Sequence, residues 1–255
     1  MNDNVVASEG TSAAPSSDVP AVALVTGGSR GIGAATVRTL VARGMRVCFT
    51  YRRDEDAATA LLAHVSASRT CVAIRADAID EESTERAFRA AESLGRVTLL
   101  VNNVGMTRRV APLGSWQAAE IRDVLDVNLY APLLASGIAA RRWTHDPGGR
   151  SIVNVSSAAA SSGAPREYVA YAAAKAGVDA LTVGLAKELA SVGIRVNAVA
   201  PGTTDTGIHA AAGDPSRGTR VAATVPMNRI AHPQEVAEAI AWWHPTQPHT
   251  SVGRC

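Results

Sequence analysis

Two side chains capable of acid–base chemistry lie four residues apart in an alanine-rich run. Tyr171 and Lys175 frame the segment Tyr-Ala-Ala-Ala-Lys, and this spacing places both on one face of a helix. A free tyrosine has a pKa of about 10, so it exchanges protons poorly near neutral pH. A nearby ammonium stabilises the phenolate and lowers that pKa, so the pair could move a proton near neutrality. Taken alone, such a pair is more often a surface or interface feature.

A glycine-rich segment follows the first apolar run. It spans Gly27–Gly33, with the sequence GGSRGIG, and leads directly into a helical pattern. Glycines allow a sharp turn and let a pyrophosphate approach the N–H groups at a helix N-terminus. The spacing is G-x-x-x-G-x-G, not the G-x-G-x-x-G of the general dinucleotide fingerprint. We predict a dinucleotide site here; the alternative is only a tight turn between a strand and a helix.

Three arginines surround this predicted site. Arg52 and Arg53 end the second apolar run, where an acidic residue would bind a ribose 2′-hydroxyl, and Arg30 lies inside the glycine segment. A guanidinium suits a 2′-phosphate, which favours NADP(H) over NAD(H). Asp54 follows directly and could weaken that preference. Arg52 and Arg53 could also be ordinary solvated loop charges.

The elements that must position these residues alternate along the chain. Short Val/Ile/Leu-rich runs of strand character are separated by longer Ala/Leu/Glu/Arg-rich runs of helical character. The strand runs are Ala21–Thr26, Arg46–Tyr51, Thr70–Ala76, Val97–Asn102, Ser151–Val155 and Ile194–Val199. The helical runs are Gly31–Arg43, Asp54–Ala67, Glu81–Leu94, Ser115–Arg142 and Tyr168–Val192. The alternation predicts an α/β fold with a doubly wound, mostly parallel sheet in one domain over residues 21–243.

Taken in order, the motifs resemble those of the short-chain dehydrogenase/reductase superfamily, from Ala21 to about Trp242. The similarity is to members such as 3-oxoacyl-carrier-protein reductases and glucose 1-dehydrogenases. The matching motifs are Thr26–Gly33, Asn102–Gly105, Asn128, Ser156–Ser157, Tyr171–Lys175 and Pro201–Gly202.

The resemblance implies hydride transfer between a nicotinamide and a small-molecule carbonyl or secondary alcohol. Tyr171 would exchange a proton with the substrate oxygen, and Ser157 would hydrogen-bond the same oxygen. Lys175 would bind the nicotinamide ribose and lower the pKa of Tyr171, while Asn128 would hold a water linking Lys175 to solvent. The alternatives are that Ser157 is a loop hydroxyl and that Asn128 caps or bends its helix.

The resemblance also implies a set of cofactor contacts, all beyond the carboxyl ends of strands. These residues are Gly27, Ser29, Arg30, Gly31, Ile32, Gly33, Arg52, Arg53, Asp77, Asn102, Gly105, Tyr171, Lys175, Pro201, Gly202 and Thr203. Asp77 would contact the adenine, although it could be a turn residue, and Thr203 would lie near the nicotinamide amide. The small-residue stretch Thr203–Val225 could form a lid, but it lacks an aromatic or charged signature for a ligand.

The chain departs from the family pattern at three places. Val104 replaces the usual alanine, and the segment between Ser157 and Tyr171 is one residue longer than the commonest spacing, which makes Ser156 a fallback. Residues 244–255 are polar, contain two prolines and show no strand pattern where the family has its last strand. We expect that strand to be missing or altered, and a frameshift is our hypothesis for the cause. This change would lower stability and impair the homodimer or homotetramer that the resemblance implies.

A non-catalytic or decayed dinucleotide-binding protein is the alternative function.

Composition excludes several other classes of function. The net charge of +2 over 255 residues argues against nucleic acid or an anionic membrane as a partner. The three cysteines form no C-x-x-C and the six histidines form no H-E-x-x-H, so no metal site is predicted. We expect no apolar run to approach the ~20 residues that a membrane span needs. Residues 1–20 have no signal-peptide features and are expected to form a disordered leader of a cytoplasmic protein. Arg141 and Arg142 could dock an acidic acyl carrier or end a solvated helix.

Overall fold

A six-stranded parallel sheet forms the centre of the computed structural model, which describes residues 19–65, 70–146 and 148–243. Its strands are β1 (Ala21–Val25), β2 (Arg46–Tyr51), β3 (Cys71–Arg75), β4 (Arg96–Asn102), β5 (Arg150–Val155) and β6 (Ile194–Val199). Their order across the sheet is β3-β2-β1-β4-β5-β6, and every adjacent pair is parallel. The predicted doubly wound α/β fold is confirmed.

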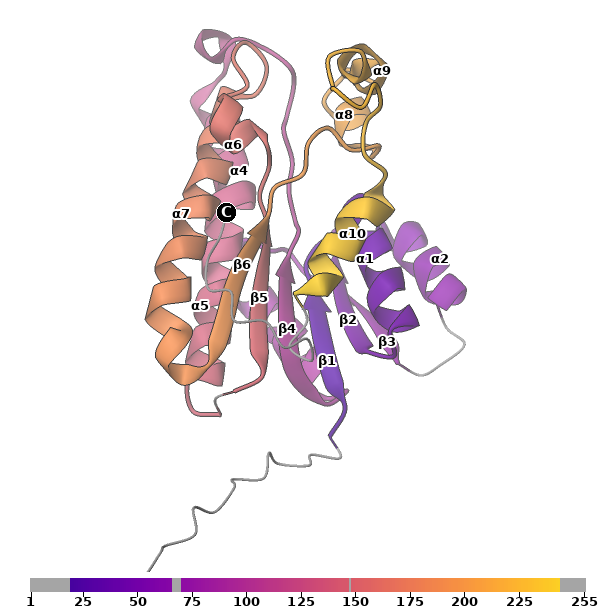
Figure 1. Ribbon diagram of the computed structural model, residues 1–255, viewed down its shortest axis with the longest axis vertical. Coiled ribbons are helices and arrows are strands. Elements are labelled where there is room, and N and C mark those ends of the chain that lie inside the picture. Colours follow the sequence, from indigo (N-terminus) through magenta and orange to yellow (C-terminus); the bar gives the residue numbers. More distant parts are fainter. Residues whose placement is uncertain (1–18, 66–69, 147, 244–255) are drawn as a thin grey trace, which may run out of the picture.

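Helices cover both faces of the sheet, as Figure 1 shows. On one face α1 (Gly31–Ala42), α2 (Glu55–Val65) and α10 (Pro233–Trp242) share a buried apolar cluster with the strands. On the other face the helices are α3 (Glu81–Glu92), α5 (Ala131–Trp143) and α7 (Val169–Leu189). Because both faces are buried, the strands contain apolar runs instead of alternating apolar and polar residues. The strand order changes direction between β1 and β4, because β2 and β3 are added on one side of β1 and β4 to β6 on the other. Open α/β sheets bind ligands at such a switch point.

The predicted helical run Ser115–Arg142 is divided in the structure. A short 3₁₀ turn, η1 (Leu113–Ser115), precedes α4 (Ala118–Leu125), and a π-helical turn, η2 (Asp126–Tyr130), joins α4 to α5. The backbone of Gln117 donates a hydrogen bond to the Glu120 side chain, so α4 begins only after this cap. Widened turns of this kind are frequent at functional sites.

Short helices lie beyond the carboxyl ends of the strands. α6 (Ala159–Ser162) follows β5 there, whereas η3 (Ala190–Val192) extends α7 at the opposite edge of the sheet, just before β6 begins. After β6 come α8 (Ile208–Ala211) and α9 (Arg217–Ala222), which lie at the top of the view in Figure 1. They occupy the stretch that the sequence predicts to be a lid.

The expectation that no apolar stretch reaches the length of a membrane span was wrong. The segment Val169–Val192 is long and apolar enough to cross a membrane, judged by length and composition alone. This segment is α7 with η3, and it packs against the sheet as a core helix. Val178, Ala186 and Leu189 are buried, and so are the polar side chains of Lys175 and Thr182.

The two ends of the chain are not among the described residues. The expected leader, apart from its last two residues, and the altered tail at 244–255 lie outside the described ranges. Within these ranges no strand follows β6, so the expectation about the last strand remains a prediction.

Candidate active site

A cavity of about 1090 Å³ opens at the carboxyl ends of the strands. Its lining comes from the loops after all six strands, from the start of α7, and from α8 and α9. The volume is large enough for a dinucleotide together with a small substrate. We call the part along the glycine segment and β2 the cofactor end. The part between α7 and the lid is the substrate end.

The glycine segment forms the floor of the cofactor end. Gly27 and Gly31 have φ angles of +63° and +55°, a conformation that favours glycine. A Cβ placed on Gly33 would lie 2.3 Å from the carbonyl oxygen of Gly27, so this close turn admits no side chain. Arg30 at the N-cap of α1 gives no side-chain hydrogen bond to the first turn. The first N–H groups of α1 are therefore suited to bind a phosphate, and the segment fits a dinucleotide.

Asn103 fastens the glycine segment to the loop after β4. Its Nδ2 donates to the carbonyl oxygens of Thr26 at 3.0 Å and Gly27 at 2.9 Å. The Thr26 hydroxyl accepts a hydrogen bond from the Asn103 N–H at 3.0 Å, and the Gly27 N–H donates to Thr50 Oγ1 at 3.0 Å. Asn103 lines the cavity but was missed as a site residue, although it belongs to the predicted Asn-Asn-Val-Gly motif.

Two predicted cofactor residues, Asn102 and Gly33, do not line the cavity. Asn102 is buried in the sheet, where its Nδ2 donates to Asn154 Oδ1 at 2.8 Å and Ser136 Oγ at 2.9 Å. Successive strand side chains alternate between faces, and Asn102 lies on the face covered by α5 and α7. The prediction for Asn102 was wrong because this residue joins strands and helices instead of contacting a ligand. Gly33 packs against the glycine segment outside the cavity, and the segment can approach it closely because Gly33 has no side chain.

The remaining predicted cofactor residues all line the cavity. They are Gly27, Ser29, Arg30, Gly31, Ile32, Arg52, Arg53, Asp77, Gly105, Tyr171, Lys175, Pro201, Gly202 and Thr203.

The three arginines differ in their partners. Arg52 pairs with Asp77 at 3.0 Å, and Arg30 lies 3.7 Å from Asp54. Asp54 also accepts a hydrogen bond from the backbone at the start of α2. Arg53 is exposed and forms no ion pair within the described part of the chain. Carboxylates thus offset two of the three positive charges, and Arg53 retains the full charge of its guanidinium.

Tyr171 and Lys175 meet deep in the cavity, from one face of α7. Lys175 is 3% exposed, and its Nζ donates to the carbonyl oxygen of Val155 at 2.7 Å. The same Nζ lies 5.7 Å from the centre of the Tyr171 ring. Burial lowers the pKa of Lys175 to about 8.

The expected lowering of the Tyr171 pKa by Lys175 does not occur in this structure. Burial raises the pKa of Tyr171 above its usual value, and a hydrogen bond with Ser157 offsets only part of the rise. The ammonium of Lys175 is directed at Val155, and its position over the ring gives the phenolate little support. Tyr171 is therefore held in its protonated form.

Ser157 lies beside Tyr171, as the resemblance implied. Its Oγ accepts a hydrogen bond from Ala159 N at 3.1 Å, and it lines the cavity. Ser156, the fallback residue, is 2% exposed and donates to the carbonyl of Lys175 at 3.4 Å. The Ser156 hydroxyl thus joins β5 to α7, and Ser157 is the serine available to a substrate.

Asn128 lies behind the cavity wall, in the π-helical turn η2. Its Nδ2 donates to the carbonyls of Met106 at 2.7 Å and Val124 at 2.8 Å, and its Oδ1 accepts from Met106 N at 3.1 Å. A Cβ on Gly105 would lie 3.1 Å from Asn128 Oδ1 and 3.9 Å from Lys175 Nζ. Asn128 therefore positions the wall near Lys175. Its role with a water remains a prediction.

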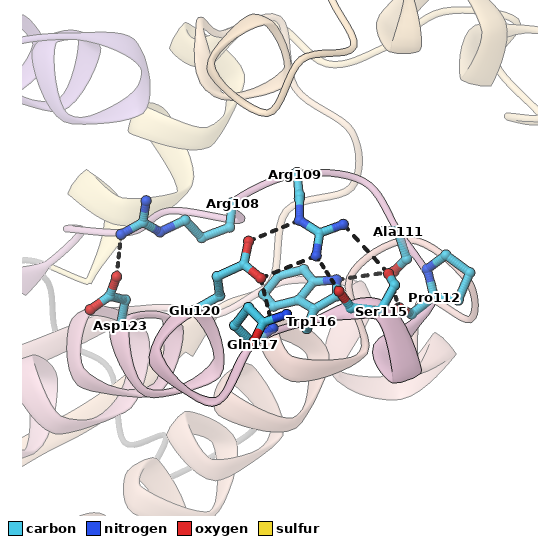
Figure 2. Close-up of polar contacts among 9 residues, drawn as sticks. All are labelled: Arg108, Arg109, Ala111, Pro112, Ser115, Trp116, Gln117, Glu120 and Asp123. Carbon is cyan, nitrogen blue, oxygen red and sulfur yellow. Dashed lines mark hydrogen bonds and ion pairs between the residues drawn. The ribbon is translucent and has the colours of Figure 1, made fainter.

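Polar contacts brace the loop between β4 and α4, as Figure 2 shows. Arg109 binds Glu120 through two hydrogen bonds of 2.8 and 3.1 Å and lies 5.9 Å from the centre of the Trp116 ring. Trp116 Nε1 donates to the carbonyl of Ala111 at 3.3 Å. Trp116 and Ala111 belong to a small apolar cluster against which Tyr171 packs. The sequence offered no signal for this brace.

Arg217 connects the lid to the start of α7. Its guanidinium donates to Glu167 Oε2 at 2.6 Å and to Thr203 Oγ1 at 3.3 Å. It also lies 5.0 Å from the centre of the Tyr168 ring. The lid therefore contains a charged residue that lines the cavity. The sequence did not single out Arg217, because its partners Glu167 and Thr203 lie far from it in the chain.

Arg141 and Arg142 are paired within the protein. Arg141 binds Glu81, and Arg142 binds Glu85 and Glu92, all on α3. Their charges are balanced along the seam between α3 and α5, so this pair offers little net charge to an acidic carrier.

Comparisons with known proteins agree with this geometry. A family model described as short chain dehydrogenase matches residues 21–216. The chain is 41% identical to cis-4-hydroxycyclohexanecarboxylate dehydrogenase from Sinomonas cyclohexanicum, over 87% of this chain and 88% of that one. A short chain dehydrogenase from Burkholderia cenocepacia, solved in complex with NADP, is 36% identical with a TM-score of 0.78, covering 86% and 88% of the two chains. A 3-ketoacyl-(acyl-carrier-protein) reductase from Brucella melitensis, complexed with NADH, is 27% identical with a TM-score of 0.84 over 93% and 96%.

Proposed function

We propose that this chain, which belongs to the short-chain dehydrogenase family, interconverts a carbonyl and a secondary alcohol using NADP(H). Tyr171 is the general acid or base, and the substrate is a small molecule. One observation carries the proposal: Ser157, Tyr171 and Lys175 line the same cavity as the glycine segment. A reacting carbon and a nicotinamide could therefore lie side by side between them.

The residues divide the chemistry between them. The bound nicotinamide supplies or accepts the hydride. The hydroxyls of Ser157 and Tyr171 hold the substrate oxygen, and Tyr171 gives its proton to that oxygen as the carbonyl is reduced. Burial raises the pKa of Tyr171, so the phenol carries its proton at neutral pH and can act as the acid when a carbonyl is reduced. Lys175, with a pKa of about 8, can take up or release a proton in the same buried region.

The preference for NADP(H) rests on the charge at the cofactor end. Arg53 has no ion pair within the described ranges, and Arg30 is only weakly engaged by Asp54 at 3.7 Å. Either guanidinium could bind a 2′-phosphate. Asp54 and Asp77 reduce the net charge, and solved relatives hold NADP in one case and NADH in another. We expect kcat/KM for NADPH to exceed that for NADH by about tenfold or more, as a charge-assisted contact provides.

The decisive experiment is a screen of ketones, aldehydes and sugars with NADPH and NADH, followed by Tyr171→Phe. This substitution removes the proton and keeps the ring, so turnover should be lost while NADPH binding is retained. Activity retained in Tyr171→Phe would reject the assigned mechanism. NADPH binding without turnover of any compound by the unaltered protein would favour a non-catalytic dinucleotide-binding protein.

We further propose a cytoplasmic homo-oligomer. Leu125 and Leu133, on α4 and α5, are 36% and 43% exposed and lie about two turns apart on one helical stretch. Apolar side chains at such a surface support contact with a second copy. Light scattering after size-exclusion chromatography should give a dimer or tetramer, and a monomer at micromolar concentration would contradict this proposal.

A further inference from the structure

The substrate end of the cavity contains buried polar groups that the proposed chemistry does not use. We propose that Tyr168 and His209 form a second substrate-binding point, which holds an uncharged hydroxyl or carbonyl oxygen away from the reacting carbon. The inference rests on the proposed function, because it concerns the same cavity. It names the substrate class as carbonyl compounds or alcohols that carry a second, neutral oxygen.

Tyr168 contributes a phenol directly next to the reacting one. It begins α7, is 3% exposed and lines the cavity. Its ring meets the Tyr171 ring edge to face, with the centres 6.4 Å apart. Its hydroxyl is buried and has no hydrogen-bond partner among the described residues. Buried polar groups are nearly always paired, so an unpaired hydroxyl beside the reacting tyrosine indicates a group that a ligand completes.

His209 contributes an imidazole from α8, across the cavity in the lid. Both of its ring nitrogens are buried, and neither reaches full hydrogen-bond geometry with a described residue, although the Thr204 backbone lies close to the ring. Burial lowers the pKa of His209 and the charge of Arg217 lowers it further, while the contact with the Thr204 backbone raises it. The ring is therefore neutral near pH 7 and offers one donor and one acceptor.

The charges around these two side chains balance. Arg217 pairs with Glu167 at 2.6 Å, and Arg220 pairs with Glu167 at 3.5 Å and with Asp214 at 2.5 Å. Two guanidinium groups thus face two carboxylates, and no net charge is left to attract an anion. This balance favours a neutral oxygen over a carboxylate or phosphate at the second binding point.

The pairing pattern defines the selectivity. A hydroxyl can donate and accept at once, and a carbonyl can accept from Tyr168 or from His209. A plain ketone would leave both side chains unpaired, as they are in the ligand-free protein, and would gain no hydrogen bond at this point. Sites built to bind a polar group discriminate strongly against analogues that lack it.

The test uses ketones matched in carbon skeleton, built around each compound that the broad screen finds to be reduced. Each set holds the plain ketone, the same ketone with a neutral oxygen, and the same ketone with a carboxylate. Cyclohexanone, 4-hydroxycyclohexanone and 4-oxocyclohexanecarboxylate form one such set. We expect kcat/KM for the neutral bifunctional ketone to exceed that of the plain ketone by about tenfold, as one net hydrogen bond provides.

Two variants assign this preference to the named side chains. Tyr168→Phe should lower the ratio of kcat/KM between the bifunctional and plain ketones by about fivefold to tenfold, mainly through KM. His209→Phe should act in the same direction, and His209→Gln should retain more of the ratio because an amide also donates and accepts. Tyr130→Phe alters an exposed tyrosine away from the cavity and should leave the ratio unchanged.

A stability measurement separates recognition from a structural role. Tyr168→Phe removes an unpaired buried hydroxyl, so the ligand-free protein should keep or raise its thermal midpoint. Equal or better kcat/KM for the plain ketone in every set, a preference for the carboxylate, or a ratio unchanged in Tyr168→Phe would each overturn the inference. Absence of turnover with every compound would instead reject the proposed function, which makes the two failures distinguishable.

Discussion

The two ends of the cavity are built in different ways. The floor of the cofactor end is backbone, formed by a glycine segment and a helix N-terminus, and the side-chain amide of Asn103 holds it through two carbonyl oxygens. The substrate end consists of side chains from separate elements, held by Arg217, Glu167 and the Arg109–Glu120 brace. We therefore expect the glycine segment at the cofactor end to tolerate almost no added side-chain volume. The substrate end can change by substitution of single side chains.

The largest expected effect tests the tight packing of the cofactor end. Gly33→Ala would place a methyl group 2.3 Å from the Gly27 carbonyl oxygen, so the loop must move. We expect NADPH affinity to fall by about a hundredfold, as displacement of a positioned site by an ångström does. Calorimetric titration measures this loss.

The matched control is a glycine inside another helix. A Cβ on Gly184 in α7 would meet nothing within 4 Å, so Gly184→Ala should stabilise the protein by about 0.5–1 kcal/mol without weakening NADPH binding. Equal behaviour of the two variants would mean that the glycine segment has no special packing.

The next effect concerns Lys175, where the two ends meet. Its pKa falls from 10.5 to about 8 on folding, so the folded protein buries a charge at neutral pH. Lys175→Met should therefore raise the free energy of unfolding by about 1–3 kcal/mol at pH 7, the lost hydrogen bond to Val155 offsetting part of the gain. The same variant should lose turnover, as activity and stability oppose each other at such sites.

The pH dependence of that gain has a definite sign. The unfolded chain keeps the Lys175 proton up to about pH 10.5, whereas the folded chain releases it near pH 8. The penalty of burial is therefore full below pH 8 and disappears above pH 10.5. Denaturant unfolding of both proteins across this range should show the difference in stability shrinking as the pH rises. A constant difference would contradict the assignment.

A smaller effect is expected when the lid connection is cut. Glu167→Gln removes the carboxylate that pairs with Arg217 and Arg220. We expect KM for the carbonyl substrate to rise about tenfold, with a much smaller change in NADPH affinity, because only the substrate end depends on the lid. Glu82→Gln, which cuts an exposed pair with Arg86, is the control and should change neither. Equal losses of substrate and cofactor binding would show that the two ends are not separable.

The smallest effect sharpens the choice of cofactor. Arg53→Ala should lower the ratio of kcat/KM for NADPH over NADH by about fivefold, since an exposed contact to a phosphate is partly screened by salt. Arg38→Ala, an exposed arginine on α1 outside the cavity, should leave that ratio as it is. An unaltered ratio in Arg53→Ala would direct attention to Arg30.

The residues that the sequence placed well share one property. The positions of Gly27 and Gly31 depend on local backbone shape, and those of Tyr171 and Lys175 depend on their spacing along one helix. Both properties can be recognised from a few neighbouring residues in the sequence. Asn102 was misplaced because the face on which a terminal strand residue lies depends on the sheet and helices around it. The raised pKa of Tyr171 was not predicted, because burial comes from the whole fold.

The sequence alone determined the alternation of strands and helices, the glycine turn and the helical spacing of Tyr171 and Lys175. These features follow from hydrophobic period and local backbone geometry. The tertiary structure decided which groups meet across longer separations, such as Arg217 with Glu167 and Arg109 with Glu120, and that Tyr168 and His209 line the same cavity. Such contacts depend on how the loops pack beyond the strand ends, and no local pattern records that packing.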